Sequence, residues 1–243
     1  MFLCIIDDNL TNQFQNLRYK EVSTQHKMTE QYHSQWKQDK FLEETIFKGH
    51  KQGVFVDVGA HDGITINNTL FFEKQHGWTG INVEPIKSVY DKLNTNRPNC
   101  TNLNCAISEQ EGELNFICNE GYTEMLSGLE NHYDQRHHQR NENEIRQMGG
   151  VKKVIKVPTK RLETVFEDNN IKHVNYLSID VEGAEYSVIK SINFNKVFID
   201  VIEFENNYED TSLPIIGYLE AKDYVLLQKG ADIFMIHKDS KFR

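Results

Sequence analysis

The chain has 243 residues, of which 36 are acidic and 27 are lysine or arginine, so its formal net charge is −9. This length fits one domain with a sizeable core and leaves room for an N-terminal extension and an insertion. The acidic balance argues against a nonspecific grip on nucleic acid, which needs clustered lysine and arginine. No apolar run approaches the length that spans a bilayer, and residues 1–6 are too short for a signal peptide. We therefore expect no membrane span and a cytoplasmic location.

The first predicted element follows a polar segment. Residues 1–33 lack clear periodicity beyond the first six, which predicts either a loosely attached arm or a contact in a homo-oligomer, and both interpretations stay open. From Gln35 to Lys48, apolar side chains recur at helical spacing. We expect an amphipathic helix there, near the start of a main domain over residues 34–243, and we expect it to cover one edge of a ligand crevice.

A short apolar run that ends in an acid and two glycines is the most informative feature of the sequence. Residues 54–58 predict a buried parallel strand that leads into a tight turn, and a helix is expected to begin near Thr65. Gly59 and Gly63 would let the backbone approach a ligand that any Cβ would push away. Asp57 places a negative charge at the carboxyl end of the strand, where parallel sheets bind their ligands.

The charges around this turn indicate which ligand it takes. A dinucleotide loop needs G-x-G-x-x-G to seat a pyrophosphate, whereas the glycines here are spaced G-x-x-x-G, with Asp57 and Asp62 beside them. Phosphate would be repelled, but S-adenosylmethionine carries a sulfonium and an ammonium group that acids attract. One βα unit later, a strand over residues 80–83 ends in Glu84, whose carboxylate can accept both ribose hydroxyls. A solvated strand end is the alternative for either acid taken alone.

Strands and helices continue to alternate, which predicts a parallel sheet with right-handed crossovers. The last two strands are joined through Lys229-Gly-Ala and are typical of a β-hairpin. Further strands are expected over residues 103–107, 174–180, 197–205, 224–228 and 232–237, helices over residues 68–76, 86–94, 162–169, 186–192 and 213–221, and a separate hairpin between residues 112–118 and 154–157.

The segment between the two strands of that separate hairpin has a different composition. Residues 119–150 are rich in asparagine, glutamine, glutamate, histidine and arginine, which predicts a mobile insertion. His132, His137 and His138 are interpreted as surface histidines rather than metal ligands, because two adjacent residues of a helix do not point to one ion.

Four phrases of the sequence, taken in order, match a known pattern. On these phrases the chain resembles the FkbM family of S-adenosylmethionine-dependent O-methyltransferases, over roughly residues 34–238. The resemblance implies a class I methyltransferase fold: a Rossmann-like α/β domain with a mostly parallel seven-stranded sheet, a C-terminal antiparallel β-hairpin and helices on both faces. It also implies methyl transfer from S-adenosylmethionine to a hydroxyl of a sugar, a glycan or a small hydroxylated metabolite. The phrases are Asp57-Val-Gly-Ala-His-Asp-Gly63, Val83-Glu-Pro85, Asn104-Cys-Ala-Ile-Ser108 and Ile179-Asp-Val-Glu-Gly-Ala-Glu185.

The resemblance further implies a cofactor site at the carboxyl ends of neighbouring strands. Ser108, or the backbone around residues 105–107, would face the adenine. The candidate cofactor-binding residues are Asp57, Gly59, Ala60, His61, Gly63, Glu84, Pro85, Ala106, Ile107 and Asp180.

Few catalytic side chains are needed, because positioning supplies much of the acceleration of an in-line methyl displacement. Asp180 and Glu182 follow a predicted strand beside the reaction crevice. Glu182 can serve as general base if desolvation raises its pKa, and His61 is a second candidate because the ordinary pKa of histidine lies close to neutrality. The alternatives are that Glu182 caps the following helix and that His61 only lines the cofactor loop.

Three further hypotheses accompany this interpretation. Asp180, Glu205 and Asn206 offer oxygen ligands suited to Mg²⁺, which would hold two acceptor hydroxyls and lower the pKa of one of them. The acceptor could instead be nucleic acid or protein, although the acidic composition counts against nucleic acid. The chain could also be a non-catalytic, methyltransferase-like binding module. The missing middle glycine disfavours a nicotinamide dehydrogenase.

Overall fold

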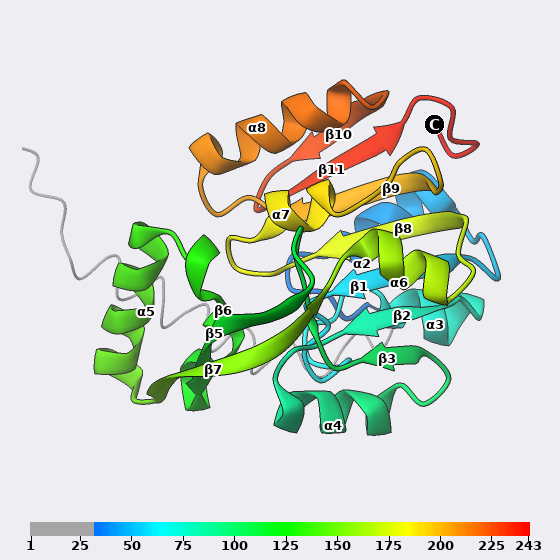
Figure 1. The fold of residues 1–243 in the computed structure, drawn as a ribbon. Helices are drawn as coiled ribbons and strands as arrows, with labels where there is room; N and C mark the ends of the chain where they lie inside the picture. The colour runs from blue at the N-terminus through cyan, green and yellow to red at the C-terminus, as the bar shows by residue number, and fades with distance from the viewer. Residues whose placement is uncertain (1–31) are drawn as a thin grey trace, which may run out of the picture. The chain divides into compact units, whose positions relative to one another are not determined.

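The computed structural model describes residues 32–243, so the predicted arm over residues 1–33 lies almost wholly outside the described residues. A seven-stranded sheet has the order β10-β11-β9-β8-β1-β2-β3 (Figure 1). Its pairings are parallel except those of β11, which is antiparallel to both β9 and β10. The predicted mostly parallel α/β sheet is therefore confirmed. Its strands are β1 (Val54–Val58), β2 (Thr79–Val83), β3 (Thr101–Leu103), β8 (His173–Ile179), β9 (Phe198–Glu205), β10 (Tyr224–Lys229) and β11 (Asp232–His237).

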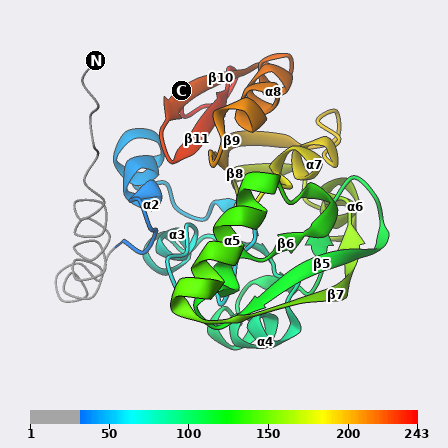
Figure 2. The ribbon, with the colours of Figure 1, turned by 90° about the vertical axis from the view of Figure 1, so that its left-hand side faces the viewer.

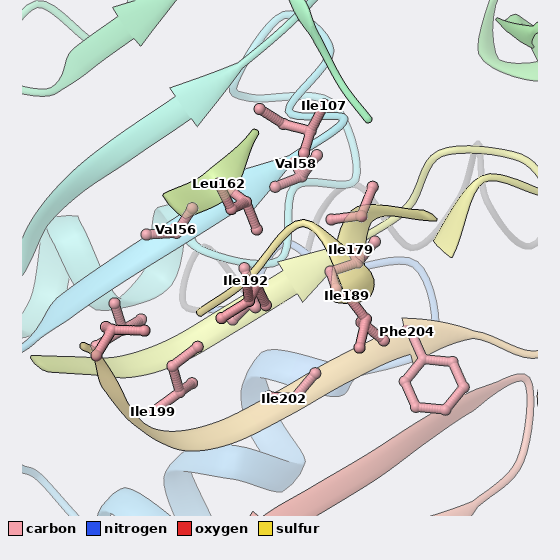
Figure 3. Packing of buried hydrophobic residues seen from close by; sticks show 14 of the residues in the cluster. Val56, Val58, Ile107, Leu162, Ile179, Ile189, Ile192, Ile199, Ile202 and Phe204 are labelled. Carbon is pink, nitrogen blue, oxygen red and sulfur yellow. The ribbon is translucent and has the colours of Figure 1, made fainter. Parts of the chain in front are cut away.

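Alternation along the central strands sends apolar side chains to both faces of this sheet. Val56 and Leu177, which are register partners, belong to one buried cluster with residues of α6, α7 and α8 (Figure 3). On the opposite face, the ring of Tyr176 lies 5.8 Å from that of Phe72 in α3 and 6.3 Å from that of Phe47. A sheet covered on both sides explains why these strands are almost continuously apolar. The helices are α2 (Gln38–Phe41), which continues as the π-helical segment η2 (Leu42–Phe47), α3 (Leu70–His76), α4 (Lys87–Asn96), α6 (Leu162–Asp168), α7 (Glu185–Lys190) and α8 (Glu209–Glu220).

A second, smaller sheet branches from the first after β3. The single strand predicted over residues 103–107 is wrong, because β3 ends at Leu103 and the next two paired residues belong to the other sheet. Asn104 forms the corner between them, since its Nδ2 donates to the carbonyl oxygens of Glu84 (2.9 Å) and Pro85 (3.0 Å). The predicted pairing of residues 112–118 with residues 154–157 is confirmed as antiparallel. The strands of this sheet are β4 (Ala106–Ile107), β5 (Gly112–Glu120), β6 (Gly128–Leu129) and β7 (Val151–Lys160).

Residues 119–150 form regular elements between β5 and β7. Two 3₁₀ turns, η3 (Gly121–Leu126) and η4 (Glu130–His132), flank β6, and the 14-residue helix α5 (Gln135–Met148) follows (Figure 2). Asp134 caps α5 by accepting a hydrogen bond from the backbone nitrogen of Arg136. The helix buries one narrow face, on which Asn141 Nδ2 donates to the Tyr133 hydroxyl at 2.9 Å.

Candidate active site

The acid at the end of β1 is buried and organises the loop that follows it. Asp57 Oδ2 accepts hydrogen bonds from Asn67 Nδ2 (2.9 Å) and Thr69 Oγ1 (2.8 Å). Burial raises the pKa of Asp57, although the charge of Arg97 and the two hydrogen bonds oppose the rise. The Asp57 carboxylate is therefore hydrogen-bonded to the loop that follows β1. It acts on a ligand indirectly, by fixing the position of that loop.

Both glycines of the loop are required by the protein itself. Gly59 has a φ of +92°, and a Cβ there would lie 1.8 Å from the carbonyl oxygen of Asp180. Gly63 has a φ of +77°, and a Cβ there would lie 2.6 Å from side-chain atoms of Leu93 and Arg97. Protein atoms that follow β8 and atoms of Leu93 and Arg97 therefore occupy the space beside the two glycines, and the expectation that these glycines let the backbone approach a ligand stays a prediction.

The helix after this loop begins later than the sequence indicated. Asp62 Oδ1 accepts from the backbone nitrogens of Ile64 and Thr65, which holds a turn where a helix was expected. The helix α3 begins at Leu70, whose backbone nitrogen donates to Asn67 Oδ1 at 2.9 Å. The predicted start near Thr65 is therefore wrong, since short polar side chains compete with the first helical turn.

Glu84 closes the next side of the crevice at the end of β2. Its side chain is buried, its Oε1 accepts from the backbone nitrogen of Ile86 at 2.7 Å, and Pro85 is half-buried beside it. Burial raises the pKa of Glu84 to about 7. The carboxyl group is therefore fixed at the carboxyl end of β2, beside the Gly59–Gly63 loop that follows its parallel neighbour β1.

His61 connects the loop to the 119–150 segment. Its backbone is left-handed, with a φ of +49°, and its Nε2 lies 2.9 Å from Glu124 Oε1. Burial opposes the charge on this ring, but the neighbouring carboxylates of Asp62 and Glu124 outweigh it and raise the pKa of His61. A histidine that favours its protonated form is a poor general base. Residue Glu124 was missed, because nothing in its local sequence indicates contact with a loop 63 positions earlier.

The candidate adenine-facing residues lie at the base of the second sheet. Ala106 is buried in a cluster with Ile86 and Val89, and Ile107 is buried in the core of the main sheet. Ala60, in the loop after β1, is also buried. Ser108 is also buried, and its hydroxyl lies 3.4 Å from that of Ser187.

Three carboxyl groups meet at the carboxyl ends of β8 and β9. Asp180, Glu182 and Glu205 each place an oxygen within 4.8 Å of the others. Part of Asp180 is exposed to solvent, but the surrounding protein atoms desolvate its carboxyl group. This desolvation and the charges of Asp232 and Glu185 raise the pKa of Asp180 to about 7. Burial and the neighbouring charge of Asp180 also raise the pKa of Glu182, and burial and the charge of Glu182 raise that of Glu205. These carboxyl groups therefore hold protons more readily than ordinary ones and disfavour further negative charge.

The side chain of Asn206 is held by two neighbours. Its Nδ2 donates to the carbonyl oxygen of Gly230 at 2.8 Å, and its Oδ1 accepts from Ser212 Oγ at 2.7 Å. The structure adds Glu182 to the predicted oxygen ligands Asp180 and Glu205, and the ligand role of Asn206 stays a prediction.

Glu182 turns away from the helix that it was expected to cap. It has a φ of +55°, and its Oε2 lies 3.4 Å from His137 Nε2 and accepts from Asn207 Nδ2 at 3.3 Å. The capping alternative is therefore wrong for Glu182. Glu185 instead supports the turn before α7, because its Oε1 accepts from the backbone nitrogen of Gly183.

A pocket of about 250 Å³ opens beside Glu182, between the 119–150 segment and the ends of β8 and β9. His137 lines it and is only 2% exposed, so the prediction of a surface histidine is wrong for this residue. The spacing of Tyr133, His137 and Asn141 at every fourth position was the signal for a buried helical face. A larger cavity of about 450 Å³ lies near Asn170 and Lys196, at the amino ends of β8 and β9 and away from these motifs.

The comparisons with known proteins agree with this geometry. A family model described as the methyltransferase FkbM domain matches residues 57–226, which is more than half of the chain. The chain belongs to the FkbM methyltransferase family. Its domain is a methyltransferase domain, so methyl transfer is the general reaction that membership supports. The curated proteins contain no match.

Solved structures resemble this FkbM chain more distantly. A methyltransferase FkbM from Methylobacillus flagellatus KT is 13% identical with a TM-score of 0.45; the match covers 77% of this chain and 44% of that one. This chain therefore spans less than half the length of that protein. The METTL16 methyltransferase domain is 10% identical with a TM-score of 0.43, and the match covers 83% of this chain and 66% of that one. No helix among residues 32–243 is both long and apolar enough to cross a bilayer.

Proposed function

We propose that the chain is an S-adenosylmethionine-dependent O-methyltransferase that acts on a hydroxyl of a sugar, a glycan or a small hydroxylated metabolite. The observation that carries this proposal is the buried carboxyl group of Glu84 at the end of β2, beside the Gly59–Gly63 loop at the end of β1. This pair of strand ends is the position at which doubly wound folds bind nucleosides. Membership of the FkbM family supports the same reaction class.

The cofactor would lie between Glu84 and Asp180, with the loop from Gly59 to Gly63 beneath it. When bound, it supplies an electrophilic methyl group. The acceptor hydroxyl would lose its proton on accepting that methyl group, so a residue beside it would have to receive the proton. Asp180 and Glu182 lie on the acceptor side of the crevice, and the pKa of about 7 for Asp180 suits a group that receives this proton at neutral pH. His61 is the weaker candidate because its carboxylate neighbours stabilise the protonated ring.

The Mg²⁺ hypothesis remains a proposal with a revised ligand set. Oxygens of Asp180, Glu182 and Glu205 within 4.8 Å of one another offer the hard ligands that Mg²⁺ prefers. Turnover that survives dialysis against EDTA, and does not rise on adding Mg²⁺, would remove the hypothesis. The expected cytoplasmic location and the homo-oligomer contact also stay predictions.

Calorimetry with S-adenosylhomocysteine tests the cofactor assignment. We expect Glu84→Gln to weaken its binding at least about 10-fold, which corresponds to the loss of one charge-assisted hydrogen bond. The matched control is Glu113→Gln, a neutralised glutamate on the exposed part of β5, which should bind as the wild type does. A wild-type chain that gives no heat of binding would favour the non-catalytic module and defeat the proposal.

A further inference from the structure

The pocket beside Glu182 is enclosed by parts of the chain that are far apart in sequence. One wall comes from η4 and α5, and the other comes from the residues that follow β8 and β9. Its volume of about 250 Å³ lies below the ~300–1,000 Å³ of pockets for drug-sized ligands. It therefore fits one small ring better than a nucleotide or a peptide.

One ring nitrogen of His137, which lines this pocket, makes no hydrogen bond with the described residues. The side chain is 2% exposed and burial lowers its pKa to about 4, so the ring is neutral at neutral pH and one of its nitrogens is an acceptor. Its Nε2 is buried and has no hydrogen-bond partner among the described residues. Its nearest ionisable neighbour, Glu182 Oε2, is 3.4 Å away. Because buried polar atoms are nearly always paired, this nitrogen points to a ligand that donates a hydrogen bond.

The charges of the pocket limit that ligand. Asp134, Glu182, Glu185 and Glu205 line it, and none of the described lining residues is a lysine or an arginine. The two guanidinium groups of α5 that act on this region are already engaged by carboxylates. Arg136 is paired with Asp134 and Asp210 and lies 3.9 Å above the ring of Tyr208, and Arg140 donates to Glu144 at 3.0 Å and interacts electrostatically with Glu182 and Glu205. A phosphate or carboxylate on the ligand would have to compete with these carboxylates for a counter-charge.

We propose that this pocket binds the methyl acceptor as an uncharged polyol, such as one unsubstituted sugar ring, and that His137 Nε2 accepts a hydrogen bond from an acceptor hydroxyl. This inference rests on the proposed methyl transfer and adds the chemical class of its acceptor. Carboxyl oxygens around the ring accept or share its remaining hydroxyl protons, while the lack of basic lining excludes sugar phosphates and uronic acids. Under this proposal, the 119–150 segment forms one wall of the pocket that binds the methyl acceptor.

The test is a binding screen by ligand-observed NMR on the full chain, with and without S-adenosylhomocysteine. The probes are matched sets: methyl hexosides, the corresponding hexose 6-phosphates and the corresponding uronic acids. We expect members of the neutral set to bind at least about 10-fold more tightly than their charged counterparts. We also expect His137→Ala to weaken the neutral set at least about 10-fold, without changing S-adenosylhomocysteine binding.

His138→Ala is the matched control, because it removes the adjacent, half-buried imidazole of the same helix, which does not line the pocket. His137→Gln is the second variant if the alanine variant unfolds. The proposal is overturned if charged probes bind as well as neutral ones, if no neutral probe binds, or if the His137 variants bind as the control does. If the wild type fails to bind S-adenosylhomocysteine, the methyltransferase proposal is defeated separately. The screen without S-adenosylhomocysteine still measures whether sugars bind in the pocket.

Discussion

Replacing Gly59 with alanine tests the claim that the Asp180 backbone, directly after β8, leaves no room for a side chain at this position. A left-handed backbone costs a non-glycine residue ~1–2 kcal/mol. The added Cβ would also lie 1.8 Å from the Asp180 carbonyl oxygen, and relieving such an overlap by moving packed strand ends costs a further ~1–3 kcal/mol. We therefore expect Gly59→Ala to lower the free energy of unfolding by about 2–5 kcal/mol.

Gly77→Ala is the matched control for this measurement. Gly77 also has a positive φ, +63°, but no atom lies within 4 Å of its would-be Cβ, so only the backbone cost applies. Urea unfolding followed by circular dichroism, without any ligand, gives both free energies. We expect the Gly59 variant to lose at least ~1 kcal/mol more than the Gly77 variant. Equal losses would refute the contact argument, and a stable Gly59 variant that no longer binds S-adenosylhomocysteine would return the glycine to a ligand-facing role.

Two other predictions follow from buried charges. Burial raises the pKa of Glu84 from its ordinary 4.5 to about 7 in the folded chain. The folded state therefore binds this proton more tightly than the unfolded state. As the pH rises from 4.5 to about 7, the contribution of Glu84 to the free energy of unfolding falls. Glu84→Gln should flatten that slope in urea titrations, and an unchanged slope would contradict the assignment. Arg97 is fully buried, is paired with Glu73 and donates to Gly63 and Asn67, so Arg97→Met should cost ~3–5 kcal/mol by stranding Glu73. Exposed Arg146→Met is the control, and a loss of similar size there would show that the buried pair is not the cause.

The main sheet could be predicted because its strands repeat one strong signal. Residues 54–58 contain four apolar residues and Asp57, residues 174–180 are mostly apolar and end in Asp180, and each run lies between helical segments. Such runs are specific to strands buried on both faces. The break after Leu103 could not be predicted, because the apolar run continues across Asn104 and the corner depends on hydrogen bonds to Glu84 and Pro85, about 20 positions earlier.

The candidate site was predictable only where strand ends supply it. Glu84, Asp180 and Glu182 follow directly from strands, and the structure brings them to one edge of the sheet. Glu124 and His137 belong to a polar segment whose composition resembles a solvent-exposed loop, and only the tertiary fold buries His137 and half-buries Glu124. For Gly59, the sequence indicated the position but not the contact, because the atom that a Cβ would meet belongs to Asp180, about 120 residues later.

The two ends of the 119–150 segment are neighbours in the second sheet, since Glu120 at the end of β5 pairs with Val151 at the start of β7. A loop whose two stems are hydrogen-bonded neighbours tolerates lengthening, trimming or grafting, because the flanking ladder does not have to move. Recombination could therefore replace the segment that contains α5 without changing the main sheet and the residues Gly59 and Glu84. Divergence of substrate preference within such a lineage would then be concentrated in this exchangeable module.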